Sequence, residues 1–187
     1  MSRTTKRTIN GMIRRALSQI KVPDAPASVF GLVDGAQDDR VVPLLTAEGN
    51  DWRCLYGTEL PRVLSAVAPY LVALSSHYPF AGYFARYGRG NNWGVMLRST
   101  ASMDDIAEHF AGMIRARLPA GREVLFRFYD PRVLRAYLPT CTKEELDAVF
   151  GPVDAFLIED GKGAWKVYRR EKGKLATREP RWDHWID

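Results

Sequence analysis

Cysteine, histidine and long apolar runs are scarce in this chain of 187 residues. The two cysteines, Cys54 and Cys141, stand in unrelated contexts, so their spacing gives no basis for a disulfide framework or a cysteine metal site. No apolar run approaches the length that crosses a bilayer, and the first residues lack the apolar core of a secretory signal. We therefore expect a cytoplasmic protein without membrane insertion.

Acidic residues are absent from residues 1–21, which carry 6 basic residues. Residues 22–160 hold 13 basic and 18 acidic side chains, and residues 161–187 hold 8 basic and 4 acidic, so the net charge of +5 comes from the two ends. A nucleic-acid-binding module concentrates Lys and Arg on its folded face, with stacking aromatics between them. This distribution predicts no nucleic-acid partner, and it leaves the basic ends available to an acidic protein.

The strongest local signals follow one another near the middle of the chain. Residues 124–129 alternate apolar and charged side chains, which indicates a strand. Asp130 is placed to cap a helix that begins at Pro131, where a missing N–H costs nothing. Thr142 and Glu145 have the spacing of a capping box for a second helix.

The remaining pattern predicts an α/β protein: a single domain with a mixed, mostly buried sheet flanked by helices, plus a small C-terminal hairpin and tail. Within it, residues 44–68 are expected to form two short helices, the second of which carries Leu60, Val63, Leu64 and Val67. Further strands are expected at 29–33, 70–74, 93–97, 155–158 and 164–169, and further helices at 9–20 and 103–118. The expected parts are a basic amphipathic helix (1–21), an α/β domain (22–153), and a reduced C-terminal lobe of hairpin and basic Trp-containing tail (154–187).

Asp34 is the first candidate for chemistry, because it follows a short buried strand and ligands often bind at strand ends. An Asp before a Gly is more often a turn residue that accepts a hydrogen bond from its own backbone. The glycine-rich segment 88–94 precedes a strand instead of opening a helix, so it lacks the geometry of a phosphate loop. We expect no catalytic residues, no cofactor and no metal; the alternative is an enzyme with a site near Asp34 and the aromatic loop Tyr78–Trp93.

Aromatic side chains give the candidates for partner binding. Five aromatics in residues 78–87 exceed what one helical face can bury, so at least one is expected at the surface or against a partner. The tail holds two tryptophans at helical spacing, which either pack on the body or anchor a partner. The candidate contacts from these two segments are Tyr83, Tyr87, Arg89, Trp93, Trp182 and Trp185.

Five motifs occur in order along the chain: LVDGAQ (32–37), APYLVAL (68–74), NNWGVMLRS (91–99), FRFYDPRVLRAYLP (126–139) and VFGPV (149–153). This succession resembles a bacterial family of type VI secretion effector chaperones, also called adaptor proteins. The resemblance implies a cytosolic α/β protein that is not an enzyme. It would bind one cognate toxic effector and help to load it onto the spike-tip protein of the secretion apparatus.

The fourth motif contains the charged positions that match this family, namely Arg127, Asp130 and Arg132. Asp130 is interpreted as a helix cap. The two arginines have two open interpretations: they fix the corner between strand and helix, or they contact the partner through their planar donor forks. The family often carries a larger variable region after FGPV, whereas this chain continues with a hairpin and a short basic tail.

Overall fold

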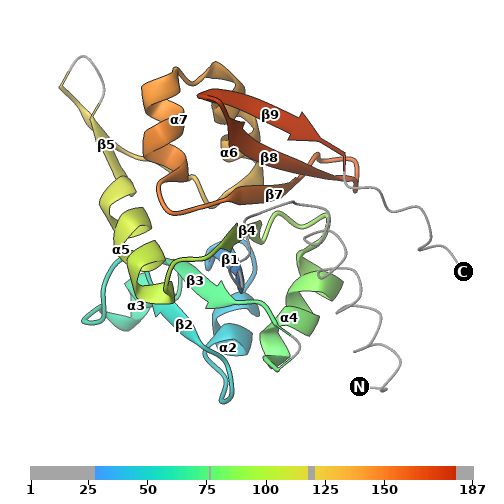
Figure 1. The fold of residues 1–187 in the computed structure, drawn as a ribbon. Coiled ribbons are helices and arrows are strands. Elements are labelled where there is room, and N and C mark those ends of the chain that lie inside the picture. The colour runs from blue at the N-terminus through green and yellow to red at the C-terminus, as the bar shows by residue number, and fades with distance from the viewer. Residues whose placement is uncertain (1–27, 76, 118–120, 180–187) are drawn as a thin grey trace, which may run out of the picture.

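A seven-stranded sheet forms the centre of the computed structural model, which describes residues 28–75, 77–117 and 121–179 (Figure 1). The strand order is β2-β3-β1-β4-β7-β8-β9. The strands are β1 (Ser28–Asp34), β2 (Trp52–Cys54), β3 (Pro69–Ala73), β4 (Gly94–Ser99), β7 (Ala155–Glu159), β8 (Trp165–Glu171) and β9 (Lys174–Arg178). A separate two-stranded hairpin joins β5 (Arg115–Arg117) to β6 (Glu123–Leu125).

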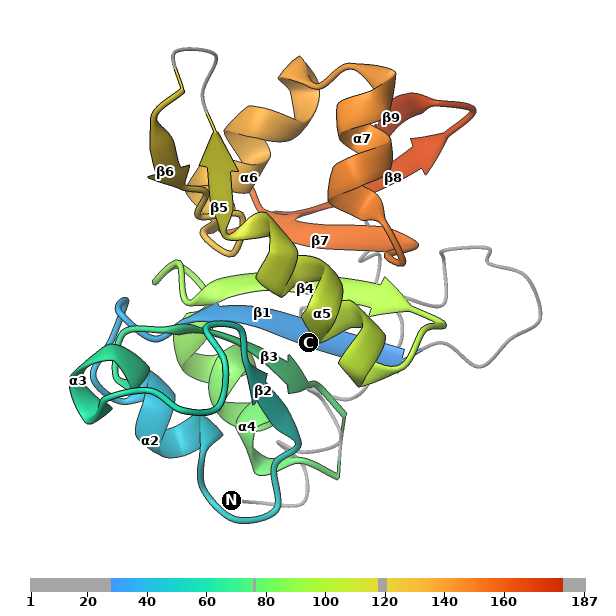
Figure 2. The same ribbon diagram turned by 90° about the vertical axis from the view of Figure 1, so that its left-hand side faces the viewer.

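Helices cover both faces of this sheet (Figure 2). One face carries α5 (Met103–Met113), α6 (Pro131–Tyr137) and α7 (Lys143–Phe150), and the other carries α2 (Val41–Leu45) and α4 (Pro79–Tyr83). A four-residue helix, α3 (Arg62–Ser65), precedes β3, and a π-helical turn (Phe84–Gly88) follows α4.

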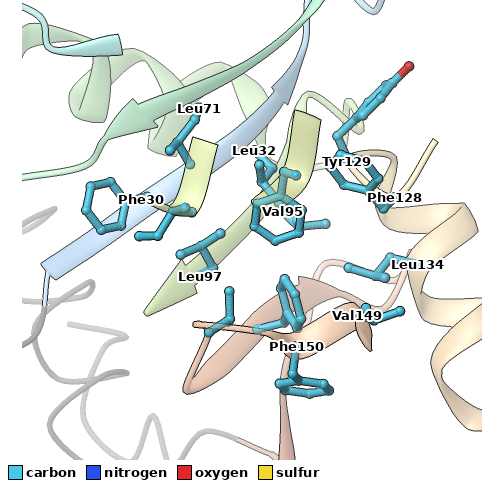
Figure 3. Close-up of a cluster of buried hydrophobic side chains, with 14 of the residues drawn as sticks. Phe30, Leu32, Leu71, Val95, Leu97, Phe128, Tyr129, Leu134, Val149 and Phe150 are labelled. Carbon is cyan, nitrogen blue, oxygen red and sulfur yellow. The ribbon is translucent and has the colours of Figure 1, made fainter. Parts of the chain in front are cut away.

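The larger core lies between the sheet and the helices α5, α6 and α7 (Figure 3). Alternate residues of β1 and β4 point into it, such as Leu32 and Leu97, and they meet Phe128, Leu134 and Phe150 from the second half of the chain. The intervening residues of the same strands, such as Val33 and Met96, belong to a second core under α2 and α4. Because both faces are covered here, β1 and β4 are mostly buried and strongly apolar.

Local signals in the middle of the chain act as expected. The Asp130 side chain accepts the backbone N–H of Arg132 and caps α6, with Pro131 in its first turn. Thr142 and Glu145 form the predicted capping box of α7. This helix ends at Gly151, whose φ of +45° suits glycine and whose Cα lies against the ring of His109, where a Cβ would overlap it.

The strand predicted over residues 124–129 is shorter in the structure, where β6 ends at Leu125. Phe128 and Tyr129 are both buried, and consecutive strand residues cannot both face one core. The chain instead turns, and the N–H of Asp130 donates to the carbonyl of Arg127 at 3.0 Å. This turn places Arg127 and Asp130, two charged positions of the fourth motif, side by side.

The α/β class and the single domain with a helix-flanked sheet are confirmed, with one difference in the sheet. All its strand pairings are antiparallel, so strand direction is not mixed. The C-terminal hairpin extends the main sheet, because β7 pairs with β4, and β9 adds a strand where a polar tail was expected.

The expected basic helix at 9–20, Trp182 and Trp185 lie outside the described residues. No helix within the described ranges has the length and apolar character needed to cross a membrane.

Candidate functional site

Asp34, at the end of β1, holds together segments that are far apart in sequence. Its buried carboxylate accepts hydrogen bonds from the backbone N–H of Ala36 at 3.0 Å and from the Gln37 amide at 2.9 Å. It also forms an ion pair with Arg127, whose Nη2 lies 2.7 Å from Oδ2. The turn interpretation of Asp34 is therefore correct but incomplete, since the same carboxylate anchors an arginine 93 residues away.

Asp130 holds a second arginine in the same way. Arg132 donates from Nε and Nη2 to the two carboxylate oxygens of Asp130, at 2.9 and 2.7 Å, which is a bidentate pair. Arg127 also lies 3.4 Å from Asp130, and Arg132 donates to the Gln37 side chain at 3.4 Å. These contacts link the five side chains that we call the arginine corner: Asp34, Gln37, Arg127, Asp130 and Arg132.

The arginine corner buries its acceptors and exposes its donors. The Asp34 and Asp130 side chains are 2% and 3% exposed, whereas those of Arg127 and Arg132 are 43% and 50% exposed. Solvent therefore meets the guanidinium groups and not the carboxylates. A surface of this kind offers hydrogen bonds to carboxylates and to free backbone carbonyls.

The pairing also fixes the ionisation of the corner. Burial opposes the charged form of Asp130, but the hydrogen bonds from Arg132 and the nearby charge of Arg127 outweigh it and hold the pKa of Asp130 below 3.8. The hydrogen bond to Asp34 raises the pKa of Arg127 above its usual value. Asp130, Arg127 and Arg132 are therefore charged at neutral pH, so the guanidinium groups are permanent features of the surface.

Tyr129 and Tyr56 border the corner on its buried side. Burial raises the pKa of the Tyr129 phenol strongly, and a side-chain hydrogen bond with Tyr56 and the charge of Asp34 act in the same direction. The Tyr129 hydroxyl is therefore protonated at neutral pH. Its position behind Arg127 is structural, since only 4% of the residue is exposed.

The backbone around Asp34 brings further motifs to the same place. The N–H of Asp34 donates to the carbonyl of Trp93 at 2.8 Å, and that of Gly35 donates to the carbonyl of Ala68 at 3.0 Å. A Cβ at Gly35 would lie 2.7 Å from the Ala68 oxygen, so only glycine allows this approach. Four of the five motifs noted in the sequence, those beginning at residues 32, 68, 91 and 126, thus meet at one corner.

The buried side chains of the aromatic segment lie on the other face of the sheet. Trp93 is fully buried in the core under α2 and α4, where it packs near Phe80 and Tyr87. It does not reach the surface, in contrast to the candidate role in partner contact that the sequence suggested. Tyr83 and Tyr87 are partly exposed and stack on each other at 6.4 Å between ring centroids.

Two arginines lie over the ring of Tyr87. The guanidinium carbons of Arg40 and Arg86 are 5.1 and 5.3 Å from its centroid. Arg89 is exposed and donates from Nη2 to the carbonyl of Gly163 at 2.7 Å, which ties the aromatic segment to the turn between β7 and β8. Tyr83, Tyr87 and Arg89 therefore stay available to a partner.

The two halves of the alternative enzyme site touch through the backbone, where the N–H of Asp34 donates to the carbonyl of Trp93, but their side chains lie on opposite faces of the sheet. Asp34 continues the alternation of Leu32 toward the face of α5, α6 and α7, whereas Trp93 packs on the opposite face of the sheet. In addition, the Asp34 carboxylate already accepts three hydrogen bonds. Within the described residues, no group of three or more His, Cys, Asp or Glu side chains is arranged to hold a metal ion.

Fold and corner together define an α/β protein that displays fixed arginine forks at one end of an antiparallel sheet. Residues 29–148 match the model of a protein family, DUF4123, which is described as a domain of unknown function. The match covers more than half of the chain, and the chain belongs to this family. It includes the whole arginine corner and ends in α7, before the VFGPV motif and β7, β8 and β9. Neither the curated proteins nor the solved structures that were compared with the chain include a significant match.

Proposed function

We propose that this protein is a chaperone or adaptor that binds a cognate type VI secretion effector in the cytosol and promotes its loading onto the spike protein of the secretion apparatus. One observation carries the proposal. Four of the five motifs that resemble the effector-chaperone family converge on the arginine corner, where two half-exposed arginine side chains are held by buried carboxylates.

Fixed forks suit a protein that binds other proteins. An arginine on a flexible side chain loses conformational entropy when it binds, and this loss is smaller when the side chain is already held in place. Asp34 and Asp130 hold Arg127 and Arg132 in this way. The corner thus presents two oriented donor groups to acidic side chains or free carbonyls of an effector.

In this proposal the protein acts by binding and carries out no chemical step. Asp34 and Asp130, the buried carboxylates of the corner, are each occupied by several donors. Tyr83, Tyr87 and Arg89 form a second candidate contact, available to the spike protein or to another part of the effector.

Co-expression tests the proposal. The chain, carrying an affinity tag, is produced together with the toxin and the spike protein encoded beside its gene, and the proteins retained on the resin are identified. We expect the toxin to be retained in stoichiometric amounts and the spike protein to be retained when the toxin is present. A chain that retains neither protein refutes the proposal.

A further inference from the structure

Large apolar side chains are exposed at α3. Val63 is 79% exposed, Leu64 47% and Val67, in the turn after the helix, 46%. We call these three residues the α3 patch. The remaining exposed large hydrophobic residue within the described ranges is Leu125 on β6, at 61%. Exposed apolar side chains that stand together, and not singly, mark interaction surfaces.

The α3 patch and Leu125 border the arginine corner from two sides. The chain that leaves α3 runs against Gly35, the residue after Asp34, because a Cβ there would lie 3.1 Å from the carbonyl oxygen of Ala66. Leu125 is two residues before Arg127. Figures 1 and 2 both place α3 and the β5–β6 hairpin on the same side of the molecule. The described chain therefore places its exposed large hydrophobic residues around the corner.

The α3 patch has a fixed position. The hydroxyl of Tyr70 donates to the carbonyl of Ser65, the last residue of α3, at 2.6 Å. Tyr70 belongs to the buried strand β3 and is 2% exposed, so this bond ties the helix to the core. A rigid apolar surface loses little entropy when another protein covers it.

The charges around the α3 patch favour one kind of occupant. Arg127, Arg132 and the exposed Arg62 present donors, and the carboxylates that pair with the first two are buried. Glu59 is the exposed acidic residue nearest to α3 in sequence. A second copy in a symmetric dimer would bring arginines onto arginines. Residues 1–21 of this chain hold 6 basic and no acidic residues, so they also carry the wrong charge.

We propose that the α3 patch, Leu125 and the forks of Arg127 and Arg132 form one docking surface for an acidic amphipathic segment of the effector. Apolar side chains of that segment pack on Val63, Leu64 and Val67, while its carboxylates accept hydrogen bonds from the arginines. This inference rests on the proposed function, since it specifies which surface and which chemistry recognise the effector.

Two variants, Val63→Asp and Leu64→Asp, test the surface with the neighbouring toxin as the probe. Ala148→Glu is the matched control, because Ala148 is exposed on α7, and α7 lies well away from α3 in Figures 1 and 2. Binding is measured with purified proteins, and folding is checked by thermal melting. We expect each patch variant to bind the toxin on the order of tenfold more weakly, with the control and all melting temperatures unchanged.

A photo-cross-linking amino acid placed at Leu64 identifies the segment that lies on the patch. Mass spectrometry of the cross-linked toxin should give a peptide with apolar residues at helical or alternating spacing and several acidic side chains. A cross-linked peptide without acidic residues overturns the inference.

Other outcomes also overturn it, and they differ from a failure of the proposed function. If the wild type binds the toxin and both patch variants bind it equally well, the function stands and the surface is wrong. The function also stands and the surface is wrong if the patch variants bind the toxin but no longer retain the spike protein. The same conclusion follows if the chain alone forms a dimer that the patch substitutions dissociate. If the wild type binds neither toxin nor spike protein, both proposals are refuted.

Discussion

Asp34 and Arg127 form one ion pair, but removing Asp34 and removing Arg127 should lower the stability of the protein by different amounts. Asp34→Ala deletes the acceptor of three hydrogen bonds, from Ala36, Gln37 and Arg127. Arg127→Ala deletes one hydrogen bond to Asp34 and a longer contact with Asp130, and leaves Asp34 with two donors. The first change should therefore cost more than the second.

The magnitudes follow from burial. A hydrogen bond to a charged group contributes about 1.5–3 kcal/mol and a neutral one about 1 kcal/mol, but water replaces part of this at half-exposed donors. The Arg127 side chain is 43% exposed, so water can solvate it once Asp34 is gone. We expect Asp34→Ala to lower the free energy of unfolding by about 2–4 kcal/mol and Arg127→Ala by about 1–2 kcal/mol. Their coupling energy should be about 1 kcal/mol.

Urea denaturation of the wild type, both single variants and the double variant measures these values in one double-mutant cycle. Similar m-values across the four proteins are required for the comparison. A cost of Arg127→Ala equal to or larger than that of Asp34→Ala would refute the assignment of Asp34 as the centre of the corner. A coupling energy near zero would show that the two side chains do not stabilise each other in solution.

Three further predictions concern acid stability, the arginine fork and close packing. Since the folded-state pKa of Asp130 is lowered, its contribution to stability is present above the ordinary value of 3.8 and is lost as pH falls below it; the stability deficit of Asp130→Asn, measured by denaturation across pH, should therefore shrink in acid. Arg132→Lys should leave the melting temperature nearly unchanged but weaken toxin retention in pull-downs, because lysine keeps the charge next to Asp130 and loses the bidentate fork; a larger effect on melting than on retention would make the fork part of the scaffold only. A Cβ at Gly94 would overlap the backbone carbonyl of Leu32, so Gly94→Ala should cost more than about 3 kcal/mol in urea denaturation, whereas Gly112→Ala, on the open side of α5, should be neutral or stabilise by up to about 1 kcal/mol; equal effects would contradict this packing.

The sequence predicts the elements whose signals are local. Asp130 with Pro131, and Thr142 with Glu145, specify two helix starts through contacts within four residues, and both are present. Buried strands such as β1 and β3 are also close to the expected ranges, because they are covered on both faces and therefore consist of apolar runs.

Two strands without a strand pattern of their own were missed. β2 is three residues long and β9 is polar; β2 pairs with the edge of β3, and β9 pairs with β8, which precedes it across a two-residue turn. The strand expected over 124–129 fails because Phe128 and Tyr129 both pack into the same side of the molecule. The alternation of apolar and charged residues in a sequence does not show which hydrophobic core the segment packs into.

The candidate site also divides into features that a local sequence signal predicts and features that depend on residues far away in the sequence. Arg127 and Arg132 were singled out by their motif, but their partners could not be assigned, because the pairing of Arg127 with Asp34 spans 93 residues. Gln37 had no signal beyond its place in the first motif. Composition likewise could not separate Tyr83 and Tyr87, which reach the surface, from Trp93, which is buried. Exposure of Val63 and Leu64 depends on how a four-residue helix is placed on the body.

The position of β4 in the sheet has a consequence for the protein during its synthesis. One edge of β4 pairs with β1, which is made earlier, but the other edge pairs through Met96 and Leu97 with Leu157 and Phe156, roughly 60 residues further along. At ribosomal rates of about 5–20 residues per second, that buried edge waits roughly 3–12 s for its partner. A nascent chain that stalls after α7 would contain the entire family-matched region and still expose an apolar strand edge, the type of surface that recruits other strands. Pairing with β7 thus covers this edge of β4, and β8 and β9 then extend the sheet to its final edge.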